Sequence, residues 1–163
     1  DYDFGDLVDT GAGTGTGNYE SLLANDGPRH QIANSAQRLG SSVNSEADAK
    51  QSGFAGGDGT SDNGVTIPSM IAGQNASFTV NANVAGYLSA WIDWNRDGDF
   101  ADPNETITTS MSVSAGSNSL SVSVPMTAVT GQSLGARFRF TVDAGTADTP
   151  YGLSPSGEVE DYG

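Results

Sequence analysis

Short alternating segments in residues 65–163 are the feature that most constrains the fold of this chain. Residues 76–82 alternate strictly, with Phe78 and Val80 on one face and polar or small residues on the other. Residues 119–124 repeat the pattern, with one leucine and two valines separated by serines. A period of two is the pattern of a β-strand that buries one face. These segments therefore predict strands that pack against a common core.

Three further segments extend this pattern. Residues 86–92 are apolar on both sides and predict a central strand, and residues 106–108 predict a short one. Residues 134–142 predict a strand with its phenylalanines in the core and with Arg137 and Arg139 outside. Short strands separated by turn residues are typical of sandwiches and jelly rolls. We therefore expect an all-β fold, an antiparallel β-sandwich or jelly roll.

Residues 1–64 differ in character, because they are rich in Gly, Asp, Asn and Ser and show little periodicity. We expect a long irregular N-terminal segment with one helical turn at 19–24. An irregular stretch of this length is unusual in a compact domain and needs something to hold it. Its scattered acidic residues predict that bound ions do so. We expect one domain over 1–163, loop-rich over 1–64 and strand-rich over 65–163, cut from a larger protein.

The charge balance narrows the choice of partners. The chain has 20 Asp and Glu against 6 Lys and Arg, a net charge of −14. Such a surface repels nucleic acid and anionic membranes and attracts cations, and carboxylate oxygens suit Ca²⁺. Cysteine is absent, so no disulfide stiffens the chain, and metal ions are a physical substitute. The sequence predicts Ca²⁺ as cofactor, with neither nucleic-acid binding nor membrane insertion.

The stretch 93–100, Asp-Trp-Asn-Arg-Asp-Gly-Asp-Phe, is the sharpest motif. Oxygens at alternate positions of a tight loop converge on one point, and a glycine at the sixth place permits the sharp turn. A strand precedes the loop where an EF-hand has a helix, so the motif predicts a structural calcium clip, with an acidic turn lacking any ion as the alternative. The predicted ligands are Asp93, Asn95, Asp97 and Asp99, closed by Glu105 one position later than in an EF-hand.

Other acidic residues leave alternatives open. A second calcium site is predicted from Glu46, Asp48, Asp58 and Asp62, against a solvated acidic loop. At the C-terminus, Glu158 and Glu160 share one strand face. If that strand neighbours residues 134–142, a cross-strand ladder with the two arginines follows. In the competing interpretation, Glu158 and Asp161 bind calcium together with Asp1, Asp3 or Asp6.

Signs of catalysis are weak. His30 is the one histidine, no cysteine could help it bind zinc, and no Gly-x-Ser-x-Gly motif accompanies it. We therefore predict that the chain is not an enzyme. Aromatic rings could stack on sugars, which makes Trp91, Trp94 and Tyr151 candidates for glycan binding. Packing against the calcium loop is the alternative, favoured by the position of Trp94 inside that loop.

The C-terminal Gly-Glu-Val-Glu-Asp-Tyr of residues 157–162 resembles the signature of the GEVED domain. Further motifs similar to that family extend over essentially the whole chain. They lie at 3–6, 11–19, 25–30, 39–40, 62–65, 90–95 and 136–139. The family usually carries a dense acidic run before the Gly-Val, but residues 56–63 here contain only Asp58 and Asp62, which weakens the case for a second ion.

The resemblance implies a β-sandwich accessory module of large secreted or surface proteins of bacteria, often found in adhesins and secreted hydrolases. Together with the predicted calcium loop, it leads us to expect a calcium-binding structural or adhesive module, located outside the cell or on its surface. Its expected partners are the flanking domains of the same polypeptide, and glycans in the alternative. That alternative is a carbohydrate-binding accessory module.

Overall fold

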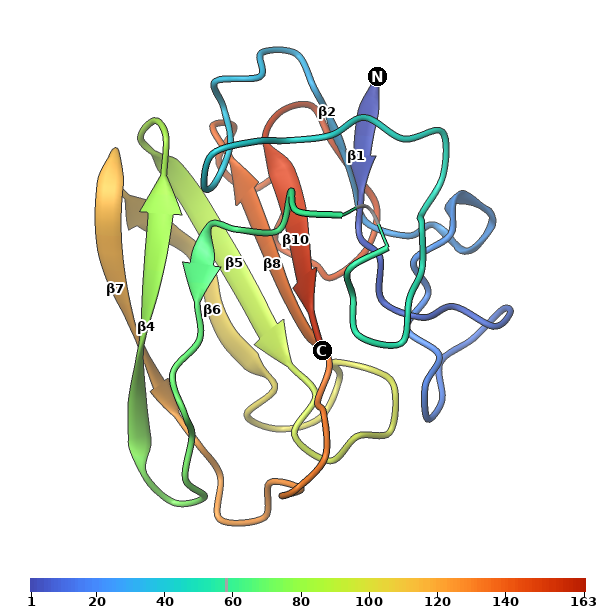
Figure 1. Cartoon of the computed structure of the whole chain (residues 1–163), viewed down its shortest axis with the longest axis vertical. Coiled ribbons are helices and arrows are strands. Elements are labelled where there is room, and N and C mark those ends of the chain that lie inside the picture. The colour runs from blue at the N-terminus through green and yellow to red at the C-terminus, as the bar shows by residue number, and fades with distance from the viewer. Residues whose placement is uncertain (58) are drawn as a thin grey trace.

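The computed structural model describes residues 1–57 and 59–163 and has the all-β fold that the sequence predicts (Figure 1). One short 3-10 helix, η1 (Leu23–Asn25), lies among the strands. The strands are β1 (Tyr2–Phe4), β2 (Arg29–Gln31), β3 (Val65–Thr66), β4 (Asn75–Ala82), β5 (Gly86–Ile92), β6 (Thr106–Val113), β7 (Gly116–Ser123), β8 (Ala136–Thr141), β9 (Leu153–Ser154) and β10 (Glu158–Tyr162).

Two antiparallel sheets form a sandwich. One has the strand order β10-β8-β5-β6 and the other β3-β4-β7. The apolar side chains of the alternating segments meet between the sheets, as predicted, and Phe78, Val80 and Phe138 are fully buried there. The predicted strand at 86–92 coincides with β5, which is central in its sheet. The third predicted strand is longer than expected, because β6 continues to Val113 along β5.

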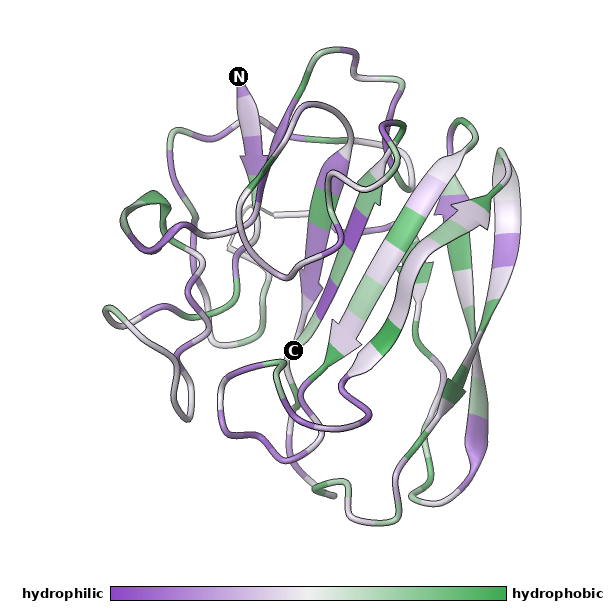
Figure 2. Ribbon diagram, turned by 180° about the vertical axis from the view of Figure 1, so that it is seen from behind, coloured by the Kyte–Doolittle hydropathy of each residue, from purple (hydrophilic) through white to green (hydrophobic). Residues whose placement is uncertain are grey.

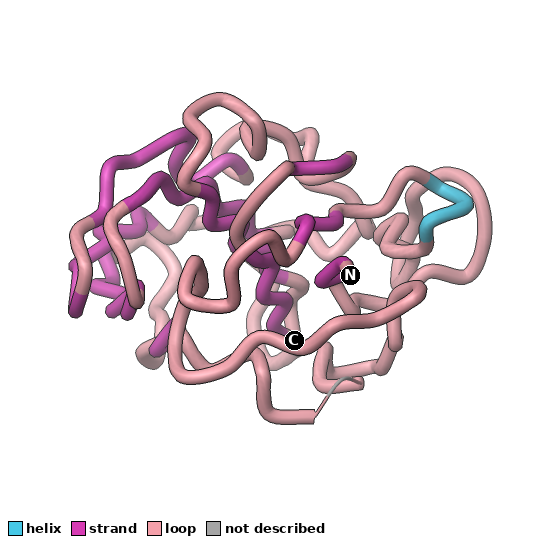
Figure 3. Tube along the Cα trace, turned by 90° about the horizontal axis from the view of Figure 1, so that it is seen from above, coloured by secondary structure: helices cyan, strands magenta, loops and turns pink. Residues whose placement is uncertain are grey.

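A third layer covers the outer face of the β10-β8-β5-β6 sheet. It contains the small β1-β2-β9 sheet, in which β2 and β9 run parallel, and the loops of the N-terminal half. Figure 1 shows this half on the side of β8 and β10 away from β4 and β7, and Figure 3 shows the same separation from above. Residues 1–64 are mostly irregular, as predicted, although they also supply β1 and β2.

This third layer corrects the prediction that both arginines of the 134–142 segment lie outside. Arg137 and Arg139 do point away from the sandwich core, but the covering layer buries them to 0% and 1% exposure. All the residues of β8 are buried, because Ala136, Phe138 and Phe140 face the sandwich core and the third layer covers the opposite side. Figure 2 shows hydrophilic and hydrophobic bands alternating along β8 and β10 in the interior. None of the described residues forms a helix long and apolar enough to cross a membrane.

Candidate cation-binding loop and the signature strand

The predicted calcium loop joins β5 to its neighbour β6. Its first residue, Asp93, is fully buried, and its carboxylate organises the turn. Asp93 Oδ1 accepts hydrogen bonds from the backbone N–H of Arg96 and Asp97 at 2.7 and 3.2 Å, and Oδ2 accepts that of Gly98 at 2.9 Å. Gly98 has φ of +93°, the left-handed conformation that its place in the motif requires. Asp93 thus holds the loop by accepting hydrogen bonds from its backbone amides.

Glu105 closes the loop from the other end. Its Oε1 accepts the backbone N–H of Trp94 at 3.1 Å, and its Oε2 accepts that of Asp102 at 3.2 Å. Burial, together with the nearby carboxylates of Asp93 and Asp97, raises the pKa of Glu105 to about 7. The two buried acids therefore form a frame that fixes the loop ends.

The more exposed acids of the loop converge on one another. Asp97, Asp99 and Asp102 each offer a carboxylate oxygen, and these oxygens all lie within 4.8 Å of one another. The Asn95 amide joins this group, because Nδ2 donates to Asp97 Oδ2 at 3.0 Å and to Asp102 Oδ2 at 2.6 Å. Such a spacing of oxygens fits a hard cation between them. We call Asn95, Asp97, Asp99 and Asp102 the loop cluster.

The loop cluster overlaps the predicted ligand set without coinciding with it. Asn95, Asp97 and Asp99 belong to both, whereas Asp93 and Glu105 bind loop amides in this structure. Asp102 was not predicted. It stands just before Pro103 in the sequence, outside the alternate positions of the motif, so only the fold of the loop reveals it.

Packing from the N-terminal half stabilises the loop. The Tyr19 hydroxyl donates to Asp93 Oδ2 at 2.6 Å, and the Tyr19 ring lies 5.5 Å from that of Phe100. Burial and the Asp93 carboxylate raise the pKa of Tyr19, so the hydroxyl stays protonated and donates. A side chain at Gly98 would collide with the Gly15 carbonyl, so the two backbones touch there. The loop geometry therefore depends on residues far away in the sequence.

The signature strand β10 pairs antiparallel with β8, in a register that decides its contacts. Glu158 and Glu160 lie opposite Phe140 and Phe138, while Asp161 lies opposite Arg137. Directly opposed residues share a face. The prediction of an Arg–Glu ladder is therefore wrong, because the two glutamates lie on the face of β10 that does not carry the arginines.

Asp161 is the acid that meets an arginine. Arg137 Nε donates to Asp161 Oδ1 at 2.8 Å, and Nη2 donates to Oδ2 at 2.9 Å, so the pair is bidentate. Both side chains are fully buried. Although neither side chain touches water, each charge is satisfied by two hydrogen bonds with the other. The predicted alternative of calcium at Asp161 would compete with this ion pair.

The acids at this end also hold the N-terminal half through its backbone. Glu160 Oε1 accepts the N–H of Asn63 and of Gly64 at 3.0 and 2.8 Å. Glu158 Oε2 accepts that of Leu39 at 2.5 Å, and Asp161 Oδ2 accepts that of Leu7 at 3.0 Å. Carboxylate–amide hydrogen bonds thus tie residues of the irregular half to β10.

Comparison with protein families agrees with this signature strand. Residues 87–163 match the family model of the GEVED domain. Residues 87–163 form a GEVED domain. No curated protein and no solved structure matches the chain significantly. The match includes the loop cluster and the signature strand, whereas the N-terminal motifs that resemble the family lie outside it.

The second arginine of the GEVED domain is held by neutral acceptors. Arg139 Nε donates to His30 Nε2 at 3.0 Å, and its other nitrogens donate to the carbonyls of Thr149, Tyr151 and Gly152. Burial, together with the nearby charge of Arg137, lowers the pKa of Arg139 to about 9. The guanidinium therefore still carries its charge at neutral pH and binds the 149–152 segment.

His30 is neutral in this arrangement. Burial and the neighbouring Arg139 charge hold the pKa of His30 well below its ordinary value. Because Nε2 accepts the Arg139 hydrogen bond, the proton sits on Nδ1, which donates to the Ser156 carbonyl at 2.6 Å. Both ring nitrogens are occupied in joining β2 to the GEVED domain.

The described residues of the predicted second site each contact a different part of the N-terminal half or of β10. Asp48 is exposed and accepts the N–H of Leu23 at 2.7 Å, near the start of η1. Glu46 is buried, accepts the N–H of Phe4 at 3.3 Å and lies 3.7 Å from the Lys50 ammonium. Asp62 precedes Asn63, which Glu160 binds. Asp58 lies outside the described residues.

The predicted glycan-stacking aromatics differ in exposure. Trp91 and Trp94 are 2% and 3% exposed, which leaves no ring face free for a sugar, and Trp94 Nε1 donates to the Asn104 carbonyl at 2.9 Å. The packing interpretation therefore holds for these two residues. Tyr151 remains partly exposed.

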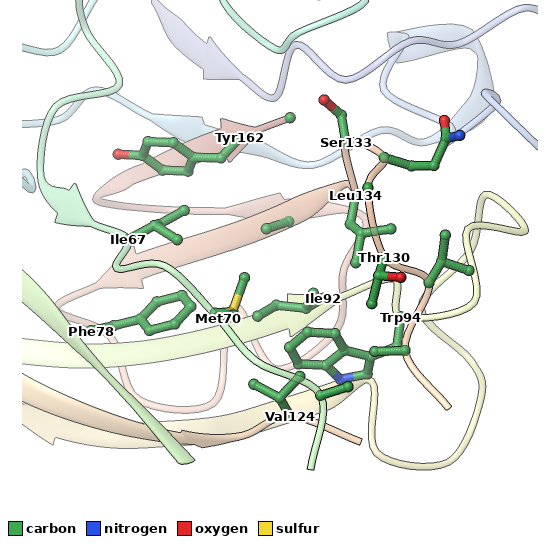
Figure 4. A pocket seen from close by; sticks show the side chains of 17 residues that line it. Ile67, Met70, Phe78, Ile92, Trp94, Val124, Thr130, Ser133, Leu134 and Tyr162 are labelled. Carbon is green, nitrogen blue, oxygen red and sulfur yellow. The ribbon is translucent and has the colours of Figure 1, made fainter. Parts of the chain in front are cut away.

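An apolar cavity of about 310 Å³ opens near the C-terminal end of the described chain, between the two sheets of the sandwich (Figure 4). Its walls include Ile67, Phe78, Ile92, Trp94 and Tyr162. The same indole of Trp94 borders a separate hollow of about 250 Å³ beside Asn95, Asp102 and Glu105. The loop cluster therefore has open space on its Asn95 and Asp102 side.

Proposed function

We propose that this GEVED module is a non-catalytic structural or adhesive unit, stiffened by calcium at the loop cluster. The observation that carries the proposal is the convergence of the Asp97, Asp99 and Asp102 oxygens to within 4.8 Å of one another. Together with water, these carboxylates offer the oxygen-only ligand set that Ca²⁺ prefers. The Asn95 amide, whose Nδ2 now donates to Asp97 and Asp102, makes way for the ion by turning. The ion neutralises carboxylates that otherwise repel one another, so binding and folding are coupled.

The frame around the loop cluster favours this role. Asp93 and Glu105 already hold the turn through its amides, so an ion meets a loop that is largely in place. A site between two paired strands stiffens the end of the sandwich, unlike an EF-hand sensor, which moves helices. Calcium at the loop cluster therefore acts as a structural clip.

The wider setting fits a module outside the cell. The chain has no cysteine and a net charge of −14, so bound cations are a physical substitute for disulfides. Calcium outside cells is abundant enough to fill even a weak site. We propose that the module is part of an extracellular or cell-surface protein of a bacterium, and that its nearest partners are the flanking domains of the same polypeptide.

A non-catalytic role is supported by the state of His30. The side chain is fully buried, and both ring nitrogens are occupied by hydrogen bonds to Arg139 and Ser156. A general base must reach a substrate proton, and a buried, engaged imidazole does not. His30 therefore acts as a structural link between β2 and the GEVED domain.

Isothermal titration of the chelator-treated protein with CaCl₂ tests the proposal. We expect the double variant Asp97→Asn/Asp102→Asn to lose one equivalent of bound Ca²⁺ relative to the unmodified chain. The control Asp48→Asn removes one exposed acid remote from the loop cluster and should bind as the unmodified chain does. The proposal is contradicted if the double variant binds the same number of ions with the same affinity as this control.

A further inference from the structure

Buried carboxylates gather at the free edge of the signature strand. Val159 N–H donates to Asp3 Oδ2 at 2.7 Å, which places Asp3 beside the two glutamates of β10. Glu160 binds Asn63 N–H, which brings the adjacent Asp62 to the same edge. Glu158 and Glu160 are fully buried, Asp3 is 1% exposed, and Asp62 is partly buried. We call Asp3, Asp62, Glu158 and Glu160 the signature cluster.

In the described residues, no arginine or lysine forms a salt bridge with Glu158. Arg137 and Arg139 lie on the other face of the sheet, bound to Asp161 and to the 149–152 segment. The salt bridges found in the described residues join Arg29 to Asp26, Lys50 to Glu46 and Arg137 to Asp161, so none reaches Glu158. Buried carboxylates close to one another are costly unless a positive charge offsets them. Glu158 therefore calls for a counter-charge.

One oxygen of Glu158 shows where that counter-charge belongs. Glu158 Oε2 accepts the Leu39 N–H, but Oε1 is buried and has no hydrogen-bond partner in the structure. Burial raises the pKa of Glu158 well above its usual range, and the Glu160 and Asp3 carboxylates raise it further. A buried carboxylate oxygen without a partner either takes up a proton or meets a cation.

We infer that Glu158 Oε1 is a ligand of a second divalent cation, held with Asp3 and Asp62 and separate from the loop cluster. A dication offsets two negative charges at once, whereas a proton neutralises one carboxylate and leaves its neighbours repelling each other. The ligand atoms are all oxygens, which suit a hard cation such as calcium. Glu160 is a positioning residue, because its oxygens bind the Asn63 and Gly64 amides that present Asp62.

Ion binding at this edge involves a small adjustment. In the described part of the chain, only the group Asp97, Asp99 and Asp102 already brings three ligand oxygens within 4.8 Å of one another. The cation draws the Glu158 and Asp62 side chains inward, while their backbones stay held by β10 and by Glu160. The site then joins the GEVED domain to residues 3 and 62 of the N-terminal half, which goes beyond the proposed clip at the loop cluster.

The test uses the Asp97→Asn/Asp102→Asn variant as its background, so that the loop cluster contributes no signal. Titration of this chelator-treated variant with CaCl₂ should still show one bound Ca²⁺. Adding Glu158→Gln should weaken that binding at least tenfold, whereas adding Asp48→Asn should leave it unchanged. The inference is overturned if the background variant binds no Ca²⁺, or if Glu158→Gln binds as tightly as the background, which is the outcome for a protonated Glu158.

A second measurement covers the case in which Glu158→Gln does not fold. Hydrogen exchange of the background variant should show that Ca²⁺ slows exchange at Asn63 and Gly64, because the cation orders the segment that Glu160 binds. Unchanged exchange at saturating CaCl₂ overturns the inference. Failure of this inference can be told apart from failure of the proposed function. The calcium clip at the loop cluster is tested by the Ca²⁺ equivalent that Asp97→Asn/Asp102→Asn removes, and both measurements here start from that variant.

Discussion

The two faces of the β10-β8-β5-β6 sheet are stabilised by different physics. The inner face packs apolar side chains such as Phe138 and Phe140 against the β3-β4-β7 sheet. The outer face is equally dry, yet it buries Arg137, Arg139 and Asp161 under the N-terminal half. Apolar packing is tolerant of partner identity, whereas each buried charge requires specific partners. The inner face therefore supplies the general stability of the sandwich, and the outer face fixes which segments dock on it.

The largest effect is expected on the inner face. Phe138 is fully buried, and its ring lies 6.2 Å from that of Phe78 and 5.7 Å from that of Tyr162. We expect Phe138→Ala to lower the free energy of unfolding by about 3–5 kcal/mol, because it removes buried area and leaves a cavity. Urea denaturation measures this change. The exposed Met126→Ala control should change it by less than about 0.5 kcal/mol.

The outer face should respond to the loss of one charge. Asp161→Asn leaves Arg137 buried without its counter-charge, and we expect a loss of about 3 kcal/mol in the free energy of unfolding. The matched control is Asp26→Asn, which breaks the surface pair with Arg29 and should cost under about 1 kcal/mol. Equal costs for the two variants, measured by urea denaturation, would show that the outer face does not depend on its buried pair.

A smaller effect is expected where the signature strand holds the N-terminal backbone. Glu160→Gln replaces the acceptor of the Asn63 and Gly64 amides with a neutral amide, and we expect a loss of about 2 kcal/mol in the free energy of unfolding. Hydrogen exchange should quicken at these two amides. Glu20→Gln is the control, because its carboxylate accepts the Gly13 N–H at an exposed position. A similar response from both variants would contradict the structural role of Glu160.

The smallest effect is a pH dependence of the outer face. The pKa of His30 lies well below 6.5 in the folded chain, so below pH 6.5 the unfolded chain takes up a proton that the folded chain does not. Stability is therefore present above pH 6.5 and lost as the pH falls, by about 1 kcal/mol between pH 6.5 and 5.5. The measurement is the difference between the unfolding free energies of the unmodified chain and His30→Gln at the two pH values. If this difference does not change with pH, His30 is not held neutral by the fold, and the prediction is contradicted.

The comparison of the two faces also explains what could be predicted from the sequence. The inner face follows from alternation, so β5 was predicted with its correct bounds and Phe78 and Val80 with their correct side. The outer face does not follow from alternation. Alternation predicts which side chains share a face of the strand, but it does not predict which segment covers the outer face. Arg137 and Arg139 were for that reason placed in solvent, although the third layer buries them.

The candidate sites divide in the same way. Local spacing identified Asn95, Asp97, Asp99 and the turn at Gly98, since these lie within a few residues of one another. Asp102 enters the loop cluster only through the folded loop. The Arg–Glu ladder failed because strand register, which sequence spacing leaves open, puts Glu158 opposite Phe140 and Glu160 opposite Phe138. Contacts that depend on strand register or on a distant segment leave no pattern in the local sequence, so they could not be predicted from it.

Thermal unfolding of the unmodified chain in excess EGTA and in excess CaCl₂ tests the calcium-stiffened scaffold most directly. Calcium at about a hundredfold its dissociation constant adds about 2.7 kcal/mol of stability per site, provided that the unfolded chain does not bind it. For a chain of this length, the account predicts a rise in Tm of about 5–10 °C with CaCl₂ over EGTA. The same Tm in both solutions would contradict it.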